Sequence, residues 1–267
     1  MKDILHRTAE IIPATRKNAP VTHCITNPVV TNDSANALLA VGAKPIMAEH
    51  PDEMPDIVRV ADAELLNLGC INESKMKAMI NAGTASLKKD IPVVLDLVGV
   101  SCSTLRRDFA KRLISEVKPK IIKGNYSEIY SVLGMNADSK GLESLTGLNE
   151  KAVEKLKCFA EKHNAVILAT GKQDLIVSKD EIYICGNGTA RLSLVTGTGC
   201  IVGALTAAYS ACGDYTASAL LAVSEMGICG ELCENIRGLG SFRVGLIDAL
   251  SEFESSALFD NIKIREI

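Results

Sequence analysis

A glycine-rich turn, Thr196-Gly197-Thr198-Gly199-Cys200, has the residue types and spacing best suited to chemistry in this sequence. Its two glycines let the backbone turn tightly and approach a ligand closely. The helical run Ile201–Leu205 follows at once, so free N–H groups and the positive end of a helix dipole face the turn. The pattern is neither a Walker A loop nor Gly-x-Gly-x-x-Gly. It fits an anion hole for a transferring phosphoryl group, formed by residues 197–200, and it also fits a plain strand-to-helix turn.

Cys200, the last residue of this turn, has two interpretations. A free cysteine is usually a small buried hydrophobe. At the N-terminus of a helix, however, the pKa of a thiol is lowered, and a thiolate can accept a proton. The sequence alone leaves both interpretations open.

Two acidic residues follow predicted strands, and ligands of open α/β sheets bind beyond the carboxyl ends of the strands. Asp96 closes the apolar run Pro92–Leu95. It fits a ligand-binding residue at the edge of the sheet, and it equally fits a helix N-cap or a turn residue. In the segment Lys123–Glu128, Asn125 and Glu128 stand one helical turn apart at the start of a predicted helix. A carboxylate there can hold Mg²⁺ through water, because this ion prefers oxygen ligands and keeps much of its hydration. A plain capping arrangement explains the same pair.

Two further polar segments lie at predicted strand ends. Thr170 and Gly171 follow the strand Ala165–Ala169 and are explained by turn chemistry alone. His23 begins the polar segment that runs to Asn36, and it fits a general base less well than a hydrogen-bonded histidine within a strand.

The elements that position these residues alternate along the chain. Nearly continuous apolar strands separated by helices predict a mostly parallel sheet with helices on both faces. Leu175–Val177 and Ile182–Cys185 flank a charged turn and predict a β-hairpin at one edge, and the chain after Cys200 reads as helical to its end. The other predicted strands are Val21–Thr26, Pro45–Ala48, Glu64–Leu68, Pro92–Leu97, Ile121–Lys123 and Ala165–Ala169. The predicted helices are Ser34–Val41, Lys75–Lys88, Leu105–Val117 and Glu150–Lys162, with an amphipathic helix at the N-terminus.

Composition limits the class of protein. A net charge of −3 argues against bulk nucleic-acid or anionic-membrane binding, which need a concentrated positive field. The nine cysteines are scattered without a C-x-x-C pair, which favours free thiols in a reducing cytoplasm. No apolar run is long enough to span a bilayer, and no linker or repeat divides the chain. We therefore expect one domain over residues 1–267.

The order and positions of these segments resemble the ribokinase-like superfamily and, within it, the hydroxyethylthiazole kinase family. The resemblance covers almost the whole chain. Its most specific feature is the cysteine at position 200, where most members of the superfamily have aspartate. The matching segments are Ile25-Thr26-Asn27, Ala35-Asn36, residues 38–43, Pro45-Ile46-Met47-Ala48, Leu66-Asn67-Leu68-Gly69, Val94-Leu95-Asp96, Val98-Gly99-Val100, Lys123-Gly124-Asn125 with Glu128, Ala169-Thr170-Gly171, Thr196 to Cys200, Ser241-Phe242 and Asp248-Ala249-Leu250.

The resemblance implies a three-layer α/β/α fold and transfer of the ATP γ-phosphoryl group to the primary alcohol of 4-methyl-5-(2-hydroxyethyl)thiazole, in thiamin biosynthesis or salvage. It also implies a homotrimer with substrate pockets between subunits. By position, it assigns Asn27, Met47 and Gly197 to the thiazole, Lys123 and Thr170 to ATP, Asp96 and Glu128 to Mg²⁺ and its waters, and Cys200 to catalysis.

Four positions depart from the family pattern. Leu97 stands where the family usually has proline, and Ser101 opens a segment where it has Gly-Ala-Thr. Leu239 replaces a proline between two glycines, and Lys123 replaces an arginine, which keeps the charge but loses the bidentate fork.

Three alternatives compete with this expectation. Another vitamin-precursor kinase of the superfamily, for hydroxymethylpyrimidine or pyridoxal, is expected to have aspartate at position 200, as is an ADP/ATP-dependent NAD(P)H-hydrate dehydratase. A thiazole or thiamin binder without activity is the third, and the intact anion-hole motif argues against it.

Overall fold

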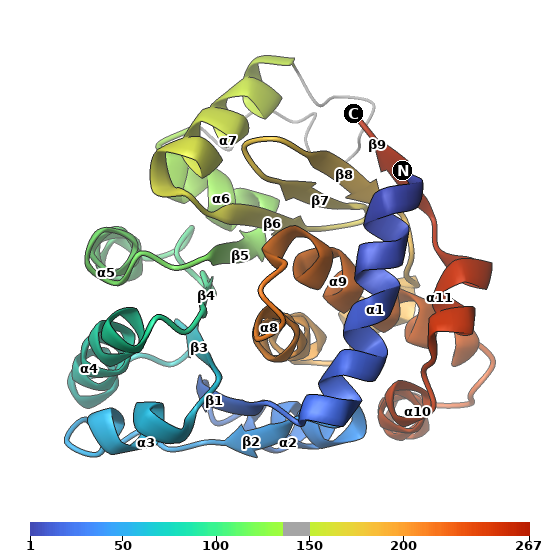
Figure 1. Ribbon diagram of the computed structural model, residues 1–267, viewed down its shortest axis with the longest axis horizontal. Coiled ribbons are helices and arrows are strands. Elements are labelled where there is room, and N and C mark those ends of the chain that lie inside the picture. The colour runs from blue at the N-terminus through green and yellow to red at the C-terminus, as the bar shows by residue number, and fades with distance from the viewer. Residues whose placement is uncertain (136–149) are drawn as a thin grey trace.

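The computed structural model describes residues 1–135 and 150–267. Its strands form one sheet in the order β2-β1-β3-β4-β5-β6-β7-β8-β9 (Figure 1). Pairing is parallel from β2 to β6 and antiparallel from β6 to β9. The strands are β1 (Val21–Ile25), β2 (Lys44–Ile46), β3 (Ala63–Asn67), β4 (Val93–Asp96), β5 (Ile121–Asn125), β6 (Val166–Thr170), β7 (Asp174–Val177), β8 (Ile182–Cys185) and β9 (Ile264–Glu266).

Helices cover both faces of the sheet (Figure 1). One core layer packs under α1 (Lys2–Asn18), α2 (Thr31–Ala40), α8 (Thr198–Ser210), α9 (Tyr215–Leu232), α10 (Leu239–Ser251) and α11 (Ser255–Asn261). The other layer packs under α3 (Met54–Val60), α4 (Glu73–Lys89), α5 (Thr104–Val117), α6 (Tyr126–Leu133) and α7 (Glu150–His163). A short 3₁₀ helix, Ala190–Leu194, precedes the glycine-rich turn.

The apolar central strands are buried on both faces, as their composition predicts. In β4, Val94 belongs to the core layer under α8, whereas Val93 and Leu95 belong to the layer under α4 and α5. The expected three-layer α/β/α fold with a mostly parallel sheet is therefore confirmed.

Two expectations about elements need correction, and one helix was not expected. The C-terminus is not helical to its end, because β9 pairs antiparallel with β8. The hairpin β7–β8 thus lies one strand inside the edge. The backbone N–H and C=O groups of β8 that an edge strand would leave unpaired bond to β9 instead. The predicted strand Pro45–Ala48 ends at Ile46 instead, which leaves Met47 and Ala48 in the following loop. The short helix α3, with a proline at its start, was not predicted.

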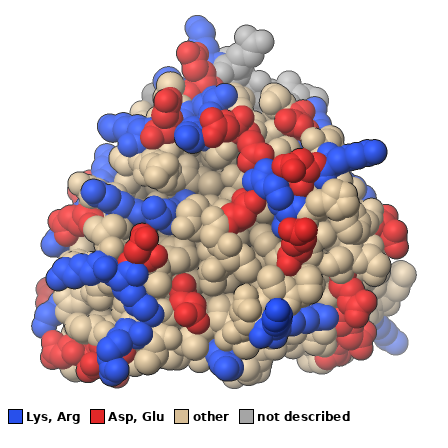
Figure 2. Space-filling view, in the orientation of Figure 1, with Lys and Arg blue, Asp and Glu red and all other residues tan. Residues whose placement is uncertain are grey.

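Acidic and basic side chains alternate over the face shown in Figure 2, and neither sign forms a continuous patch there. This mixture agrees with the small net charge of −3. Within residues 1–135 and 150–267, no helix is long and apolar enough to cross a bilayer.

Candidate active site

Five neighbouring parallel strands bring their carboxyl ends to one edge of the sheet, between β1 and β6. The pairing registers align polar side chains along this edge. Asn67 of β3 lies opposite Asp96 of β4, and Asp96 lies opposite Lys123 of β5. Asn125 of β5 lies opposite Thr170 of β6. Strand order therefore collects most of the predicted site residues in one row.

Lys123 and Asp96 form a buried ion pair at the centre of this row. Lys123 Nζ lies 3.0 and 3.1 Å from the two carboxylate oxygens of Asp96. Burial is the largest single effect and lowers the pKa of Lys123, but the charge and hydrogen bond of Asp96, with smaller contributions from Cys200 and Glu128, together raise it above the ordinary value. Burial raises the pKa of Asp96, and Lys123 and Asn67 oppose that shift. Lys123 is thus held positively charged by its partner.

Asn67 is a site residue to which the sequence assigned no role. Its amide nitrogen donates to Asp96 Oδ2 at 2.8 Å, and its oxygen accepts from Asn27 Nδ2 at 3.3 Å and from the Gly69 N–H at 2.9 Å. Asn27 Nδ2 also lies 3.5 Å from Cys200 Sγ. A continuous polar chain therefore runs from Cys200 to Lys123. The sequence did contain a signal for it. Asn67 closes an apolar strand, and that strand lies between the strand that leads to Asn27 and the strand that ends at Asp96.

The glycine-rich turn forms the start of α8. Gly197 is the N-cap with φ of 91°, and a Cβ there would lie 2.2 Å from Val30 Cγ1, so only glycine fits. No side chain caps the first turn of α8, which leaves its N–H groups available to an anion. A Cβ on Gly199 would lie 3.7 Å from Lys123 Nζ, so the backbone turn and the lysine face the same space.

The expected lowering of the Cys200 pKa is wrong. Burial raises the pKa of this thiol, and the Asp96 carboxylate adds to the effect. Lys123 and the amides of Asn67 and Asn27 oppose it without reversing it. With its pKa raised above the ordinary value by burial, Cys200 is a neutral thiol at pH 7.

Glu128 is held by backbone N–H groups. Its Oε2 accepts from the Asn125 N–H at 2.8 Å, which completes a capping box with the Asn125 side chain. Its Oε1 accepts from the Gly99 N–H at 2.8 Å and so ties α6 to the loop after β4. The predicted capping arrangement is present, and it fixes the carboxylate at the site edge.

These carboxylates fit a magnesium ion only through water. Every oxygen of Asp96 and Glu128 already accepts a hydrogen bond from Lys123, Asn67 or a backbone N–H, which leaves outer lone pairs but no free carboxylate face. Among the residues described, no cluster of three or more His, Cys, Asp and Glu side chains is arranged to hold a metal ion. An ion held mainly by nucleotide phosphates and water is compatible with this arrangement.

The remaining predicted residues lie at the two ends of the row. Thr170 is half-buried, and its hydroxyl donates to the Gly124 carbonyl at 3.4 Å. Asp174 accepts from the Gly171 N–H at 3.0 Å, and burial raises its pKa to about 7. At the other end, Met47 follows β2, is half-buried and packs against the core layer under α8. His23 lies inside the sheet, bonded to Glu64 at 2.8 Å, rather than at the rim.

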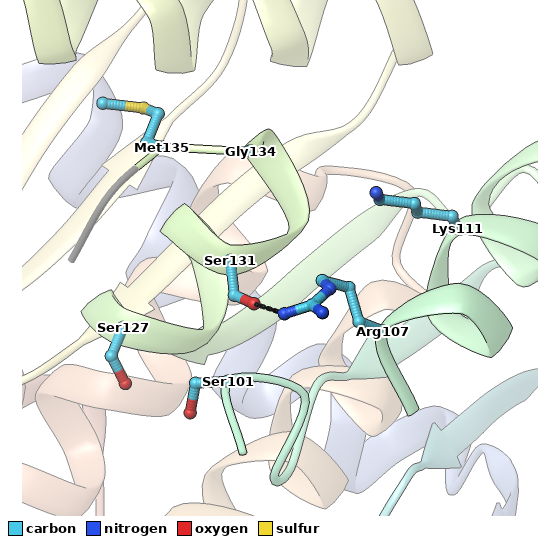
Figure 3. Close-up of a pocket in the computed structure, with 7 residues that line it drawn as sticks. All are labelled: Ser101, Arg107, Lys111, Ser127, Ser131, Gly134 and Met135. Atoms are coloured by element: carbon cyan, nitrogen blue, oxygen red, sulfur yellow. Dashed lines mark hydrogen bonds between the residues drawn. The ribbon is translucent and has the colours of Figure 1, made fainter. Parts of the chain in front are cut away.

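A cavity of about 330 Å³ opens between α5 and α6 (Figure 3). Arg107 donates to Ser131, whose hydroxyl in turn donates to the Val100 carbonyl. The Ser127 hydroxyl donates to Asn125. These two hydroxyls are thus satisfied within the protein, and no predicted site residue lines the cavity.

The departures from the family pattern lie in different surroundings. Leu97 is fully buried, next to the site in the chain, whereas Ser101 is exposed at the cavity. Leu239 begins α10 and is 42% exposed.

Comparison with solved structures shows which class of protein this fold and site define. A ribokinase-like superfamily protein from Enterococcus faecalis matches with a TM-score of 0.66 at 13% identity, covering 96% of this chain and 95% of its own. At that identity the likeness shows the fold alone. The protein has the ribokinase-like fold.

The family follows from closer matches. The model of the hydroxyethylthiazole kinase family matches residues 12–256, and the chain belongs to that family. Hydroxyethylthiazole kinase 1 of Clostridium botulinum is 43% identical over 251 residues, which are 92% of this chain and 95% of that protein. The hydroxyethylthiazole kinase structure from Pyrococcus horikoshii has a TM-score of 0.89 and 32% identity, with both chains fully covered. The resemblance and the phosphotransferase class are confirmed.

Proposed function

We propose that this protein transfers the γ-phosphoryl group of ATP to the hydroxyl of 4-methyl-5-(2-hydroxyethyl)thiazole, in thiamin biosynthesis or salvage. The supporting observation is the uncapped first turn of α8, whose Gly199 faces Lys123 Nζ and whose Cys200 contacts Asn27. This arrangement suits a transferring phosphoryl group, because it combines the free N–H groups of α8 and the buried cation Lys123 with a polar contact, Cys200 to Asn27, at the proposed position of the alcohol.

Each predicted residue has a role in this proposal. Asn27, Met47 and Gly197 hold the thiazole, which enters from the β1–β2 end of the row. Lys123 and Thr170 bind the ATP phosphates, and the N–H groups of residues 197–200 cradle the γ-phosphoryl group. Asp96 keeps Lys123 charged and fixes its direction, because both its oxygens accept from Nζ.

Magnesium is proposed to accompany ATP, with Asp96 and Glu128 orienting its waters. The ion supplies charge neutralisation at the phosphates when bound. Glu128 is suited to this because two backbone N–H groups hold its carboxylate in place.

Transfer forms a bond from the alcohol oxygen to the γ-phosphorus and breaks the bond to ADP, which leaves with the electron pair. In a loose transition state the bond to the alcohol oxygen is little advanced, so no strong base is needed and the alcohol loses its proton late, to an oxygen of the transferred phosphoryl group or to water. The Cys200 thiol, neutral because burial raises its pKa, orients the alcohol rather than abstracting its proton at the outset. A modest rather than an absolute requirement for Cys200 follows.

The same proposal includes a homotrimer in the cytoplasm, with substrate pockets completed between subunits. Exposed apolar side chains near the site support such contacts. They are Val29, Leu194, Leu239 and Val244.

The direct test is a product analysis with ATP, Mg²⁺ and hydroxyethylthiazole. Stoichiometric ADP and thiazole monophosphate are expected, and ADP release that does not depend on the alcohol would contradict the proposal. An arm with hydrated NADH separates the dehydratase, since that reaction yields NADH rather than a phosphorylated alcohol. Tight thiazole binding without any turnover would instead indicate a binding protein.

A further inference from the structure

A buried polar pair lies inside the sheet, on the face under α3 and α4, and the site above does not use it. His23 of β1 and Glu64 of β3 are paired in register and are both fully buried. His23 Nδ1 lies 2.8 Å from Glu64 Oε2, while Glu64 Oε1 has no hydrogen-bond partner among the residues described. An incompletely satisfied buried carboxylate is costly, so the pair is expected to have a role beyond packing.

The second ring nitrogen of His23 reaches the loop after β2. Nε2 lies 2.9 Å from the carbonyl oxygen of Ala48. Both ring nitrogens therefore face acceptors, and a neutral imidazole can donate to only one of them. The pair must hold one more proton, either as imidazolium with carboxylate or as imidazole with carboxylic acid. In both forms Nε2–H donates to Ala48.

Electrostatics favour retention of that proton. Burial is the largest single effect and lowers the pKa of His23, but the charge and hydrogen bond of Glu64, the bond to Ala48 and the charge of Glu53 at the start of α3 together raise it above the ordinary value. Burial raises the pKa of Glu64. Loss of the shared proton would set a lone pair of the ring against an oxygen, either of Glu64 or of Ala48.

A second buried cation holds the same loop from α4. Lys75 Nζ donates to the Thr26 carbonyl at 2.7 Å and pairs with Glu49 at 3.0 Å. Lys75 is placed by the first turn of α4, where Asn72 caps its N–H group. Lys75 therefore links Thr26, which precedes Asn27, to Glu49, two residues after Met47.

We propose that His23, supported by Glu64, is a positioning residue for the alcohol substrate: its bond to Ala48 fixes the backbone beside Met47 relative to Asn27. This inference rests on the proposed function, in which Met47 and Asn27 contact the thiazole. His23 itself touches no substrate. Its loss should weaken thiazole binding and leave ATP binding intact, because Thr170 lies at the opposite end of the row and Lys123 at its centre, both away from the loop after β2.

The test uses the double variant His23→Phe/Glu64→Leu, which removes the bond to Ala48 without leaving a lone buried charge. We expect the KM for hydroxyethylthiazole to rise about tenfold, the worth of one hydrogen bond of roughly average strength, with the KM for ATP within about twofold. Glu64→Gln should keep both values, since its amide can donate to Nδ1 and leave Nε2–H on Ala48. Tyr209→Phe/Glu225→Leu, a buried polar pair in the other core layer, is the matched control and should also keep both.

Unchanged KM values in a folded double variant would overturn the proposal, as would an equal rise for both substrates. A readout independent of activity is ¹⁵N NMR of the His23 ring in the wild-type protein. A protonated, slowly exchanging Nε2 is expected, and an unprotonated Nε2 would refute the inference even if the double variant does not fold. Wild-type protein that fails to phosphorylate hydroxyethylthiazole would contradict the proposed function, whereas the NMR result would stand separately.

Discussion

Lys123 and Asp96 depend on each other because both charges are buried. Removing one partner of such a pair leaves the other uncompensated, which typically costs about 3–5 kcal/mol. We expect Lys123→Met to lower the free energy of unfolding by roughly that amount, less whatever Asp96 recovers by taking up a proton. Chemical denaturation measures the change.

The double variant Lys123→Met/Asp96→Asn separates stability from function. Neither position then carries a buried charge, so most of the lost stability should return, while phosphoryl transfer should stay at the level of Lys123→Met. Recovery of activity along with stability would show that the pair is only structural.

Cys200 is expected to contribute modestly because its thiol is neutral. We predict that Cys200→Ala lowers kcat about 10- to 100-fold, at or below the lower end of general-base effects, about 10². Cys200→Asp should retain substantial activity, since a carboxylate can orient the alcohol and accept its proton. Steady-state kinetics measure both variants, and equal rates for Cys200→Ala and wild type would remove any role for the thiol.

At the scale of elements, the start of α8 depends on Gly197. An alanine there would combine an unfavourable positive φ with a clash against Val30. We expect Gly197→Ala to abolish most activity and to destabilise the fold by more than the 1–2 kcal/mol or so of the positive φ alone.

Gly213, in the turn between α8 and α9, provides the matched control. Its φ is 87°, yet nothing lies within 4 Å of an added Cβ. Gly213→Ala should therefore cost about 1–2 kcal/mol of stability and leave kcat unchanged. Similar activity losses in the two variants would indicate that backbone strain, rather than the anion-binding turn, explains the result.

The capping box of α6 joins a helix start to the proposed magnesium site. Glu128→Gln replaces one of two accepting oxygens by a donor, so either Asn125 or Gly99 loses its partner. We expect a loss of about 1–2 kcal/mol in stability and a higher Mg²⁺ concentration for half-maximal rate. A magnesium titration with an unchanged midpoint would count against the assignment.

The sequence predicted the strand ends well because their signals are local. Asp96 and Asn125 each close a strand that begins with an apolar run, and parallel strands end at the same edge. The glycine-rich turn follows a 3₁₀ helix instead, so its interpretation as a strand-to-helix turn is wrong. The sequence missed Asn67 because an asparagine at a strand end carries no chemistry until its neighbours are known. It also misjudged the Cys200 pKa, because desolvation depends on packing among distant segments. The strand β9 is too short to show a period, and only its pairing with β8 defines it.

At the scale of the whole molecule, a buried carboxyl group makes stability depend on pH. Burial raises the pKa of Glu225 from 4.5 to about 8, while the hydrogen bond from Tyr209 and the charge of Arg16 oppose the rise. The folded state thus holds this proton more tightly than the unfolded state. The protonated Glu225 therefore adds to the free energy of unfolding. This contribution is fully present below pH 4.5 and is lost as pH rises to about 8.

We therefore compare the free energy of unfolding of Glu225→Gln with that of the wild-type protein. Between pH 5 and pH 8.5 this difference should shift in favour of the variant by on the order of 3 kcal/mol. Thermal unfolding at several pH values measures the difference. Parallel pH profiles for the two proteins would contradict the raised pKa of Glu225.

The central claim is that this kinase acts on a thiazole alcohol. It is tested most directly by ADP release with hydroxyethylthiazole, hydroxymethylpyrimidine and pyridoxal assayed in parallel under the same ATP and Mg²⁺ conditions. We predict that kcat/KM for hydroxyethylthiazole exceeds those for the other two alcohols by at least about 100-fold, or roughly 3 kcal/mol in transition-state binding. A higher kcat/KM for hydroxymethylpyrimidine or pyridoxal would contradict the claim.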